Sequence, residues 1–365
     1  MPLCRFGILG AAGIARKNWQ AMQLAENCTL AAVASRSPER AGQFIADCQA
    51  SAPFAQFPRV AANYEELLAS PDIDAVYIPL PTGLRKPWVL RAAQAGKHVL
   101  VEKPVGVTAA DVQEMLDVCR QQKVQFMDGV MFMHSARLGR LRAVLDDGQS
   151  VGKIRRIASH FTFGSPEGFM ESNIRVSHEL EPLGSLGDLG WYNIRFTLWA
   201  LNYQLPTRVS GRILAGARRP DSSHDVPVEF SAELQFPGEA TASLFCSFLA
   251  ENQQWGVISG TRGFVQVPDF VLPYYGSEAA FTVWNNTYDV RGCNFNMQEH
   301  ARRHAAAEYS NSGLNSQETN MFREFARLAL SGQTDESWGQ IALKTQQVVD
   351  ACLASAQQDG RPVAL

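Results

Sequence analysis

A lysine stands two residues after a short apolar segment in the first third of the chain. The segment His98–Val101 is followed by Glu102, Lys103 and Pro104. If the segment is a parallel strand, Lys103 lies at the carboxyl edge of its sheet, where open α/β sheets bind cofactors and substrates. An ammonium there can hold a substrate oxygen by a charge-assisted hydrogen bond and lower the pKa of a neighbouring proton donor. A lysine before a proline is also common in solvated loops, so both interpretations stay open.

A carboxylate and a phenol lie four residues apart in the segment LGSLGDLGWY, which opens a predicted helix through Asn193–Leu201. Helical i, i+4 spacing puts Asp188 and Tyr192 on one face, so a single pocket can use both. The phenol would then give or take the proton of a substrate, while Asp188 orients a hydroxyl or tunes the lysine. In the structural alternative, Asp188 is the helix N-cap and Tyr192 a packing aromatic.

A turn rich in small residues follows the first predicted strand. In GILGAAGIARKNWQA, Gly10, Ala12 and Ala15 occupy the frame of a GxGxxG sequence, with alanine in place of the second and third glycines. That frame gives a tight turn, close backbone approach to a pyrophosphate, and a helix N-terminus that meets the anion. Similar turns occur in folds that bind no nucleotide, but the place after the first strand favours a dinucleotide site.

The end of the second predicted strand bears on the choice of cofactor. An acidic side chain there would accept hydrogen bonds from the ribose hydroxyls of NAD, and none is present. Arg36, next to Ser35 and one helical turn before Arg40, suits a 2′-phosphate instead, so we expect NADP to be preferred over NAD. The segment Ser37–Glu39 is also a helix-capping sequence, and both roles can hold together.

Short apolar segments alternate with helical patterns from Arg5 to about Met131. This alternation implies right-handed crossovers and a parallel sheet covered by helices. The predicted strands are Phe6–Leu9, Thr29–Ser35, Ala75–Pro79, His98–Val101 and Gln125–Met131. The predicted helices are Pro38–Ala50, Asn63–Ser70, Leu84–Ala95 and Thr108–Gln122.

After about Gly139 the segments become longer and richer in β-forming residues. Turns such as FPGEAT indicate antiparallel pairing. So much strand with so few helices predicts a sheet with one face on a helix and the other left for a partner subunit. The predicted strands are Ile154–Phe163, Arg208–Leu214, Val228–Phe236, Ala240–Phe248, Trp255–Val267 and Phe281–Val290. The predicted helices are Gln317–Leu330 and Gly339–Gln358, with Gly360 after the second.

Length and composition predict a globular protein of two domains, residues 1–130 and 131–365. The net charge of -3 and the lack of a basic stripe argue against a nucleic-acid partner, and no apolar run is long enough to span a membrane. The start MPLCRFGILG resembles a strand more than an export signal, so we expect a cytoplasmic protein. Seven scattered cysteines without ligand spacing predict neither disulfides nor a metal site.

Six segments, in the order GILGAAGIA, IDAVYIPLP, GKHVLVEKP, MDGVMFMH, LGSLGDLGWY and GTRGFVQV, carry a resemblance that spans nearly the whole chain. Together they resemble the glucose–fructose oxidoreductase, inositol dehydrogenase and rhizopine-catabolism (Gfo/Idh/MocA) family. The resemblance implies an N-terminal Rossmann domain with a doubly wound parallel sheet (α/β). It also implies a C-terminal α+β domain with an open-faced, mostly antiparallel sheet, and a homodimer or homotetramer built through that sheet.

The resemblance also implies roles for individual residues. Lys103 binds and polarises the reacting hydroxyl or carbonyl, and Glu102 and Pro104 shape the turn. Asp188 and Tyr192 complete the site, with Tyr192 as the general acid/base, as in sugar dehydrogenases and dihydrodiol dehydrogenases. The expected cofactor-binding residues are Gly10, Ala12, Gly13, Ile14, Ala15, Ser35, Arg36, Arg40, Pro79, Leu80, Pro81, Glu102 and Lys103.

The chain departs from the family pattern after its fourth strand. The family often has PxxxH there, with the histidine near the nicotinamide; here Arg85 takes that position, and Trp88 is a candidate to help instead. His134 and Arg175 are further candidates for substrate contact, although a buried histidine and a surface arginine are equally ordinary interpretations. Aromatic residues of the C-terminal sheet suit a sugar ring, core packing or an oligomer interface: Trp255, Tyr274, Tyr275 and Trp284.

The leading hypothesis is an NAD(P)-dependent dehydrogenase or reductase of a sugar, cyclitol or polyol, with NADP preferred and Lys103 and Tyr192 handling the proton. The alternative is a non-catalytic dinucleotide-binding sensor, against which the joint presence of Lys103, Asp188 and Tyr192 argues. A third possibility is a cofactor that stays bound while it cycles between two sugars.

Overall fold

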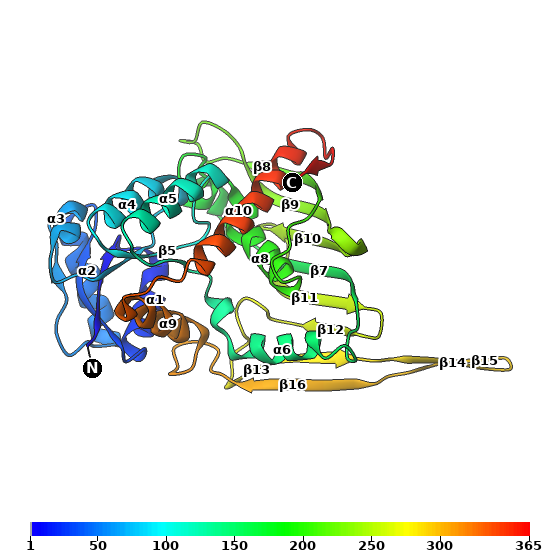
Figure 1. Cartoon of the computed structure of the whole chain (residues 1–365). Coiled ribbons are helices and arrows are strands. Elements are labelled where there is room, and N and C mark those ends of the chain that lie inside the picture. Colours follow the sequence, from blue (N-terminus) through cyan, green and yellow to red (C-terminus); the bar gives the residue numbers. More distant parts are fainter. Residues whose placement is uncertain (1) are drawn as a thin grey trace. The chain divides into compact units, whose positions relative to one another are not determined.

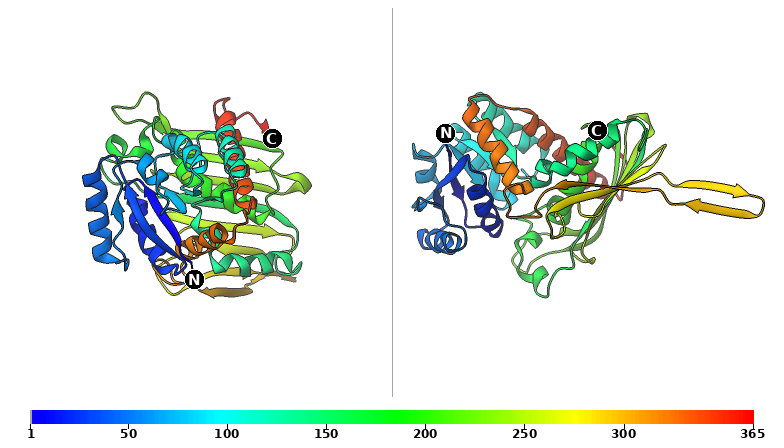
Figure 2. Two further views of the ribbon diagram at one scale, coloured as in Figure 1. Left: turned by 60° about the vertical axis from the view of Figure 1, so that its left-hand side comes forward. Right: turned by 90° about the horizontal axis from the view of Figure 1, so that it is seen from below.

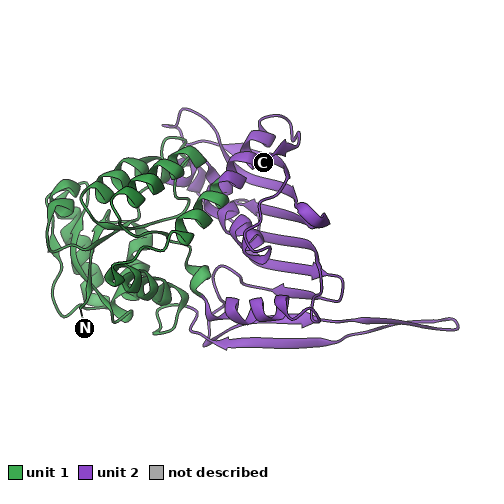
Figure 3. Ribbon diagram, in the orientation of Figure 1, with its two compact units in different colours: residues 1–134, 177–182, 311–346 green, residues 135–176, 183–310, 347–365 purple. Residues whose placement is uncertain are grey.

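The computed structural model describes residues 2–365, which group into two compact units (Figure 3). Unit 1 comprises the chain up to His134 together with residues 177–182 and 311–346. Unit 2 comprises residues 135–176, 183–310 and 347–365. The division into residues 1–130 and 131–365 that the sequence predicts differs from this grouping, because two later segments return to unit 1.

Unit 1 contains a six-stranded, entirely parallel sheet of order β3-β2-β1-β4-β5-β6 (Figure 1). This is the strand order of a Rossmann fold, so the predicted fold of the N-terminal domain is confirmed. The strands are β1 Cys4–Leu9, β2 Cys28–Ala34, β3 Arg59–Val60, β4 Ala75–Ile78, β5 His98–Val101 and β6 Phe126–Asp128. The last predicted strand is shortened, because Met131–His134 turns into a 3₁₀ helix (η1).

Three helices of unit 1, namely α2, α3 and α5, begin at side-chain caps that the sequence supplies. Ser37, Asn63 and Thr108 each accept a hydrogen bond from the backbone N–H three residues on, which satisfies one of the free donors of a helix start. The helices that follow the first five strands are α1 Gly13–Leu24, α2 Pro38–Ser51, α3 Tyr64–Ala69, α4 Thr82–Gln94 and α5 Ala109–Gln121.

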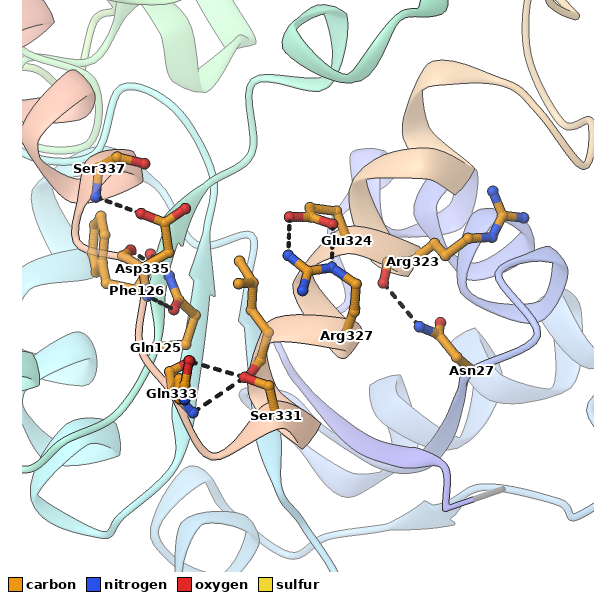
Figure 4. Close-up of polar contacts among 11 residues, drawn as sticks. Asn27, Gln125, Phe126, Arg323, Glu324, Arg327, Ser331, Gln333, Asp335 and Ser337 are labelled. Carbon is orange, nitrogen blue, oxygen red and sulfur yellow. Dashed lines mark hydrogen bonds and ion pairs between the residues drawn. The ribbon is translucent and has the colours of Figure 1, made fainter.

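Helix α9 (Gln317–Ser331) belongs to unit 1 because it completes the core on the β1 side. Phe322 and Phe325 of α9 both pack on Phe6 of β1, with ring centroids 5.6 Å apart in each pair. The Asn27 side chain donates to the Arg323 carbonyl oxygen at 2.8 Å (Figure 4). These buried aromatic contacts explain why the sequence-predicted boundary at residue 130 does not coincide with the compact unit.

The residues after α9 are also fastened to the sheet of unit 1. The Gln125 amide donates to the Asp335 carbonyl oxygen at 3.0 Å, and its oxygen accepts from the Asp335 N–H at 2.8 Å (Figure 4). The buried Gln125 side chain therefore makes two hydrogen bonds that hold the residues before α10 (Ser337–Ala356) next to β6. Helix α10 passes into unit 2 after Gln346.

Unit 2 contains a nine-stranded sheet of order β16-β13-β12-β11-β7-β10-β9-β8-β17. The pair β7–β10 is parallel and the others are antiparallel, which confirms the predicted mostly antiparallel sheet. The strands are β7 Ile154–Thr162, β8 Arg208–Ala217, β9 Val226–Gln235, β10 Thr241–Ser247, β11 Gln253–Gly260, β12 Phe264–Val267, β13 Glu278–Trp284, β16 Ala301–Ala307 and β17 Val363–Ala364. A separate ribbon consists of β14 Thr287–Arg291 and β15 Asn294–Gln298.

Two predicted strands of unit 2 are each divided. Trp255–Val267 is a hairpin, with a turn between β11 and β12, and Phe281–Val290 spans the end of β13 and most of β14. The FPGEAT turn joins β9 to β10 in an antiparallel pair, as predicted, through the short 3₁₀ helix η4 (Pro237–Glu239).

One face of the unit 2 sheet is covered by helices. Helix α6 (Ala136–Asp146) contacts β13 and β16, and α8 (Trp191–Ala200) contacts β7 and β10. Every residue of α8 is buried, so α8 forms the centre of this core. On the opposite face the side chains of the central strands are half-exposed. No helix within residues 2–365 is long and apolar enough to cross a membrane.

Candidate active site

The turn after β1 has the backbone that a dinucleotide site needs. Gly10 has φ +116°, a conformation that L side chains rarely adopt, and an added Cβ would come within 3.0 Å of the Leu80 side chain. Helix α1 starts at Gly13 after Ala12, which has no side-chain cap. The first N–H groups of α1 therefore have no side-chain acceptor, and Gly13 and Ile14 are exposed. A helix start of this kind fits a pyrophosphate.

Two arginines that follow β2 are expected to bind the 2′-phosphate of NADP. Arg36 and Arg40 are exposed and Ser35 is buried, while Ser37 caps α2 by accepting from the Arg40 N–H at 3.3 Å. The capping interpretation of Ser37–Glu39 therefore holds, and it leaves both guanidinium groups available to an anion. Burial raises the pKa of the Tyr64 phenol, and Arg36 and Arg40 oppose that shift.

Tyr64 is a residue that the sequence analysis missed. It begins α3, and its hydroxyl lies 3.9 Å from the position of a Cβ on Gly10. The Trp88 ring of α4 meets the Tyr64 ring edge-on, with centroids 4.7 Å apart. Trp88 thus supports Tyr64 beside the β1 turn. No local motif marks Tyr64, because only the folded chain brings α3 next to Gly10.

The loop after β5 is built on a buried carboxylate. Glu102 accepts hydrogen bonds from the Tyr77 hydroxyl at 2.6 Å and from the Asn18 amide at 3.3 Å, and Asn18 also donates to Tyr77 at 2.6 Å. Burial, followed by the Glu102 charge, raises the pKa of Tyr77 well above its ordinary value. The neighbouring Lys103 is half-buried, and its backbone N–H donates to Glu102 at 3.3 Å. Side chains from α1 and β4 thus fix the residue that precedes Lys103.

Arg85 braces the same loop from α4. Its side chain is buried, and its Nε donates to the Leu80 carbonyl oxygen at 2.7 Å. Its Nη1 donates to the Pro104 carbonyl oxygen. The residue that replaces the family's histidine therefore ties the loop after β4 to the loop after β5. Charge-assisted hydrogen bonds of this kind are about twice as strong as neutral ones.

The segment 177–182 closes the start of α4. Glu181 accepts from both the backbone N–H and the hydroxyl of Thr82, and the Gly83 N–H donates to the Leu180 carbonyl oxygen at 2.9 Å. A carboxylate at a helix N-terminus is favourable, so the start of α4 is satisfied by the protein itself. Pro79 and Leu80, which precede it, are buried and Pro81 is half-buried.

His134 makes contacts within unit 1. Its ring stacks on Trp338 with centroids 4.6 Å apart and an interplanar angle of 18°. Its carbonyl oxygen accepts from the Asn320 amide at 3.2 Å. These contacts agree with the interpretation of His134 as a structural histidine. No group of three or more histidine, cysteine or acidic side chains that could hold a metal is present within residues 2–365.

In unit 2, Asp188 lies inside a single π-helical turn, Leu186–Gly190 (η3), that leads directly into α8. The alternative that Asp188 is the N-cap is therefore wrong, because the residues around it already have helical backbone angles. π-Turns inside helices often occur at functional sites. Arg175 donates to the Asp188 carboxylate at 2.7 Å, so Arg175 is held by this ion pair.

Tyr192 stands in the first turn of α8 and is 6% exposed. Its ring packs edge-on against Phe161 of β7, with centroids 5.5 Å apart. The π-turn is placed by Gly184, which has φ +48° and whose added Cβ would lie 2.0 Å from the Pro227 carbonyl oxygen. Gly184 and Gly190 of LGSLGDLGWY therefore serve close packing, and that packing positions Asp188 and Tyr192.

Two family models match the chain. Residues 4–130 match an oxidoreductase family with an NAD-binding Rossmann fold, and residues 139–266 match the GFO/IDH/MocA C-terminal domain. The chain belongs to the Gfo/Idh/MocA family. The resemblance inferred from the six segments is thereby confirmed, and with it the assignment to NAD(P)-dependent oxidoreductases.

Members of the Gfo/Idh/MocA family with named activities are similar to most of this chain. The dTDP-3,4-didehydro-2,6-dideoxy-alpha-D-glucose 3-reductase of Saccharopolyspora spinosa is 31% identical over 272 residues, 74% of this chain and 76% of the relative. The D-xylose 1-dehydrogenase (NADP(+)) 2 of Haloferax volcanii is 32% identical over 259 residues, 71% of this chain and 74% of the relative.

A solved structure matches over nearly the full length. The 3-ketoreductase KijD10 of Actinomadura kijaniata, in complex with NADP and TDP-benzene, has a TM-score of 0.80 and 26% sequence identity. The match covers 97% of this chain and 98% of that chain. The predicted combination of a Rossmann domain with an open-faced sheet is that of a Gfo/Idh/MocA oxidoreductase.

Proposed function

We propose that this enzyme transfers a hydride between NADP and a carbonyl or hydroxyl carbon of a sugar, cyclitol or polyol. The observation that carries the proposal is the place of Lys103, two residues after the end of β5. Strands β1 and β5 are parallel members of one sheet, so Gly10 and Lys103 lie at the same carboxyl edge. At this edge an open α/β sheet binds both a dinucleotide and the molecule that reacts with it.

The residues around the β1 turn fit the cofactor. The backbone N–H groups from Ala12 to Ala15 would hold the pyrophosphate, and Arg36 and Arg40 would hold the 2′-phosphate of NADP. The loop Pro79–Pro81 would line the cofactor on the side of β4. When bound, NADP supplies or accepts the hydride. We expect weaker binding of NAD, because no carboxylate at the end of β2 is present to accept hydrogen bonds from its ribose hydroxyls.

Lys103 and Tyr192 handle the proton in this proposal. The ammonium of Lys103 donates a hydrogen bond to the reacting oxygen and stabilises the negative charge that develops on it. The Tyr192 hydroxyl gives a proton to that oxygen during reduction and takes it back during oxidation. Asp188 orients a substrate hydroxyl, and Arg175 holds the Asp188 carboxylate in position through their 2.7 Å ion pair.

The named relatives support a sugar-like substrate. One acts on a ketosugar attached to a nucleotide and another on xylose, and KijD10 was solved with NADP and TDP-benzene. Reduction of a sugar ketone and oxidation of a sugar hydroxyl are the same chemistry in opposite directions. A polyhydroxylated substrate is therefore the common element. The direction of hydride transfer depends on the relative concentrations of the oxidised and reduced sugar and of NADP and NADPH.

We also propose that the enzyme is a homodimer or homotetramer built through the half-exposed face of the unit 2 sheet. His160 of β7 stacks on Trp255 of β11 there, with centroids 4.1 Å apart, and Phe245 of β10 lies 5.2 Å from the same histidine. Aromatic residues are enriched at such interfaces. The seven free cysteines, six of them buried, suit a reducing compartment such as the cytoplasm.

A substrate screen tests the proposed reaction. Aldoses, inositols, diols and 3-ketosugars are offered with NADP(H) and with NAD(H), and nicotinamide absorbance is followed. We expect turnover of at least one sugar-like compound, with a lower KM for NADPH than for NADH.

The Arg36→Ala variant tests the role of the arginine. It should raise the KM for NADPH by about tenfold, the effect of losing one charge-assisted phosphate contact of about 1.4 kcal/mol, and leave the KM for NADH unchanged. Arg155→Ala, on the unit 2 sheet, is the control. A preference for NADH in the wild type would refute the role of Arg36.

A further inference from the structure

The ribbon of β14 and β15 continues the sheet of unit 2 without a break in register. Trp284 pairs with Ala301 at the end of β13 and β16, and Thr287 pairs with Gln298 at the start of β14 and β15. Between them the Asn285 N–H donates to the His300 carbonyl oxygen at 2.9 Å. We call residues 287–298 the arm. Figures 1 and 2 show that the arm projects beyond the nine-stranded sheet.

The two faces of the arm differ in chemistry. Tyr288 pairs with Met297 and Val290 with Phe295, so these four apolar side chains share one face. Their exposed fractions are 60%, 69%, 49% and 68%. The other face carries the polar side chains Thr287, Asp289, Arg291, Asn294, Asn296 and Gln298. Two isolated strands are at best marginally stable in water, so a ribbon with one bare apolar face needs a partner surface.

The register shows which way the apolar face points. In β13 the side chains of Ala279, Phe281 and Val283 are buried on the helix-covered face of the sheet. Alternation places Trp284 on the opposite, half-exposed face, and the same alternation carries on to Tyr288 and Val290. The apolar face of the arm is therefore continuous with the face of the sheet that the helices leave uncovered.

Two ion pairs join strands on the open face of the sheet. Arg156 of β7 binds Glu233 of β9 at 2.7 Å, and Arg303 of β16 binds Glu278 of β13. The apolar face of the arm carries no charged side chain, because Asp289 and Arg291, which bind each other at 2.7 Å, lie on its polar face. A surface of mixed charge, continued by the uncharged face of the arm, forms no basic patch of the kind that attracts nucleic acid or an anionic membrane surface. It suits an identical, equally neutral face, as in a twofold interface where each copy offers the same patch.

We propose that the arm binds a second copy of this chain, with its apolar face on the open sheet face of the partner. The inference rests on the proposed homo-oligomer and names the element that holds it together. Two such arms would bury about 800 Å² if each of the four side chains contributes about 100 Å². That is about half of a standard stable interface of about 1,600 Å², and the sheet face supplies the rest.

Sedimentation equilibrium of matched variants tests the arm. Val290→Lys with Phe295→Lys places two charges on the apolar face, and Asn294→Lys with Asn296→Lys places the same charges on the polar face. We expect the first pair to raise the dissociation constant of the oligomer by about 100-fold or more, equivalent to about 2.7 kcal/mol, since the loss of a few central apolar residues commonly costs an interface this much. The second pair should change it by less than about fivefold, as rim charges do.

The outcomes separate the arm from the oligomer itself. A wild-type protein that stays monomeric at every concentration would refute both the oligomer and the arm. A wild-type oligomer with equal dissociation constants in the two variants would refute the arm alone. Sugar turnover in the screen above is a separate readout, so a failure of the proposed reaction would leave this result standing.

Cys293 at the arm tip allows a direct test in the unaltered chain. It is the one exposed cysteine within residues 2–365, so a maleimide photo-cross-linker attaches there selectively. After illumination of a mixture of tagged and untagged copies, we expect covalent tagged–untagged pairs that map to the partner's unit 2. Cross-links confined to the labelled copy would contradict the proposal. The pair should disappear in Val290→Lys with Phe295→Lys.

Discussion

The two segments proposed to handle the proton are held in place by different physics. In unit 1, Glu102 beside Lys103 rests on hydrogen bonds from Tyr77 and Asn18, and Arg85 fastens Pro104. In unit 2, the Asp188–Tyr192 turn rests on close backbone packing and aromatic contact, with one ion pair at its edge. The first segment is therefore sensitive to lost hydrogen bonds, and the second to added volume.

The largest expected effect is a steric one in unit 2. Gly184→Ala places a Cβ 2.0 Å from the Pro227 carbonyl oxygen at a φ of +48°, so the turn must shift. We expect a loss of at least about 3 kcal/mol in the free energy of unfolding, read from denaturant titration. Gly168→Ala is the matched control: its φ is +76° with no atom within 4 Å, so only about 1 kcal/mol is expected. Equal losses in the two variants would show that backbone angle, and not packing, places the π-turn.

The second effect concerns the hydrogen bonds by which Arg85 holds the loop of Lys103. Arg85→Met removes the donor to the Leu80 and Pro104 carbonyl oxygens, at an expected cost of about 2–3 kcal/mol in unfolding free energy. Turnover should fall by about tenfold or more because the loop loses its position, while Arg85→Lys restores part of both. Arg91→Met on the same helix breaks an exposed ion pair with Glu65 and a cation–π contact with the Trp88 ring, 4.8 Å from its centroid, and should cost no more than about 1 kcal/mol. An Arg85→Met protein with wild-type stability and turnover would contradict the bracing role.

The third effect tests the buried carboxylate. Tyr77→Phe leaves Glu102 without its 2.6 Å donor and should cost about 1–3 kcal/mol in unfolding free energy. Because the folded-state pKa of Tyr77 lies above its unfolded value, the phenol destabilises the fold only as pH rises past the unfolded pKa of about 10. The variant should therefore lose less stability than the wild type between neutral and strongly alkaline pH. Tyr275→Phe, at a residue 99% exposed, should match the wild type throughout. A Tyr77→Phe profile parallel to that of the wild type would refute this account.

The smallest effect is expected at the edge of the unit 2 site. Arg175→Met removes an ion pair whose arginine side chain is 41% exposed, so the unfolding free energy should fall by less than about 1 kcal/mol. Turnover is the more sensitive measurement: without the guanidinium Asp188 loses its 2.7 Å partner, and turnover should fall by about tenfold as its carboxylate loses its position. A stability loss above about 2 kcal/mol would mean that the ion pair, and not packing, holds this segment.

The contrast also shows what the sequence can predict. The parallel sheet and the place of Lys103 follow from local signals, because an apolar strand and its next residues are adjacent in the chain. The role of Arg85 does not, since its partners Leu80 and Pro104 are brought together only by the fold. Tyr64 and Tyr77 were missed for the same reason.

Unit 2 shows the same division between local and long-range signals. The FPGEAT turn marks its hairpin, but β15 and β16 have few β-branched residues and form strands by pairing with β14 and β13. The π-turn at Asp188 depends on glycines that meet Pro227 and Cys246, which lie about 40–60 positions away in the printed sequence. A pattern of i, i+4 spacing cannot reveal such a turn. The roles of Lys103 and Tyr192 remain predictions that only kinetics can decide.

Turnover of Lys103→Ala and Tyr192→Phe is the most direct measurement of the proposed chemistry. With a substrate found in the screen, each variant should lose about 10²-fold or more in turnover, the usual size of an acid/base contribution. The dissociation constant for NADPH, measured by nicotinamide fluorescence, should stay within about twofold of the wild type, since neither side chain is assigned to hold the phosphates. Wild-type turnover in both variants would contradict the assignment of the proton to this lysine and tyrosine.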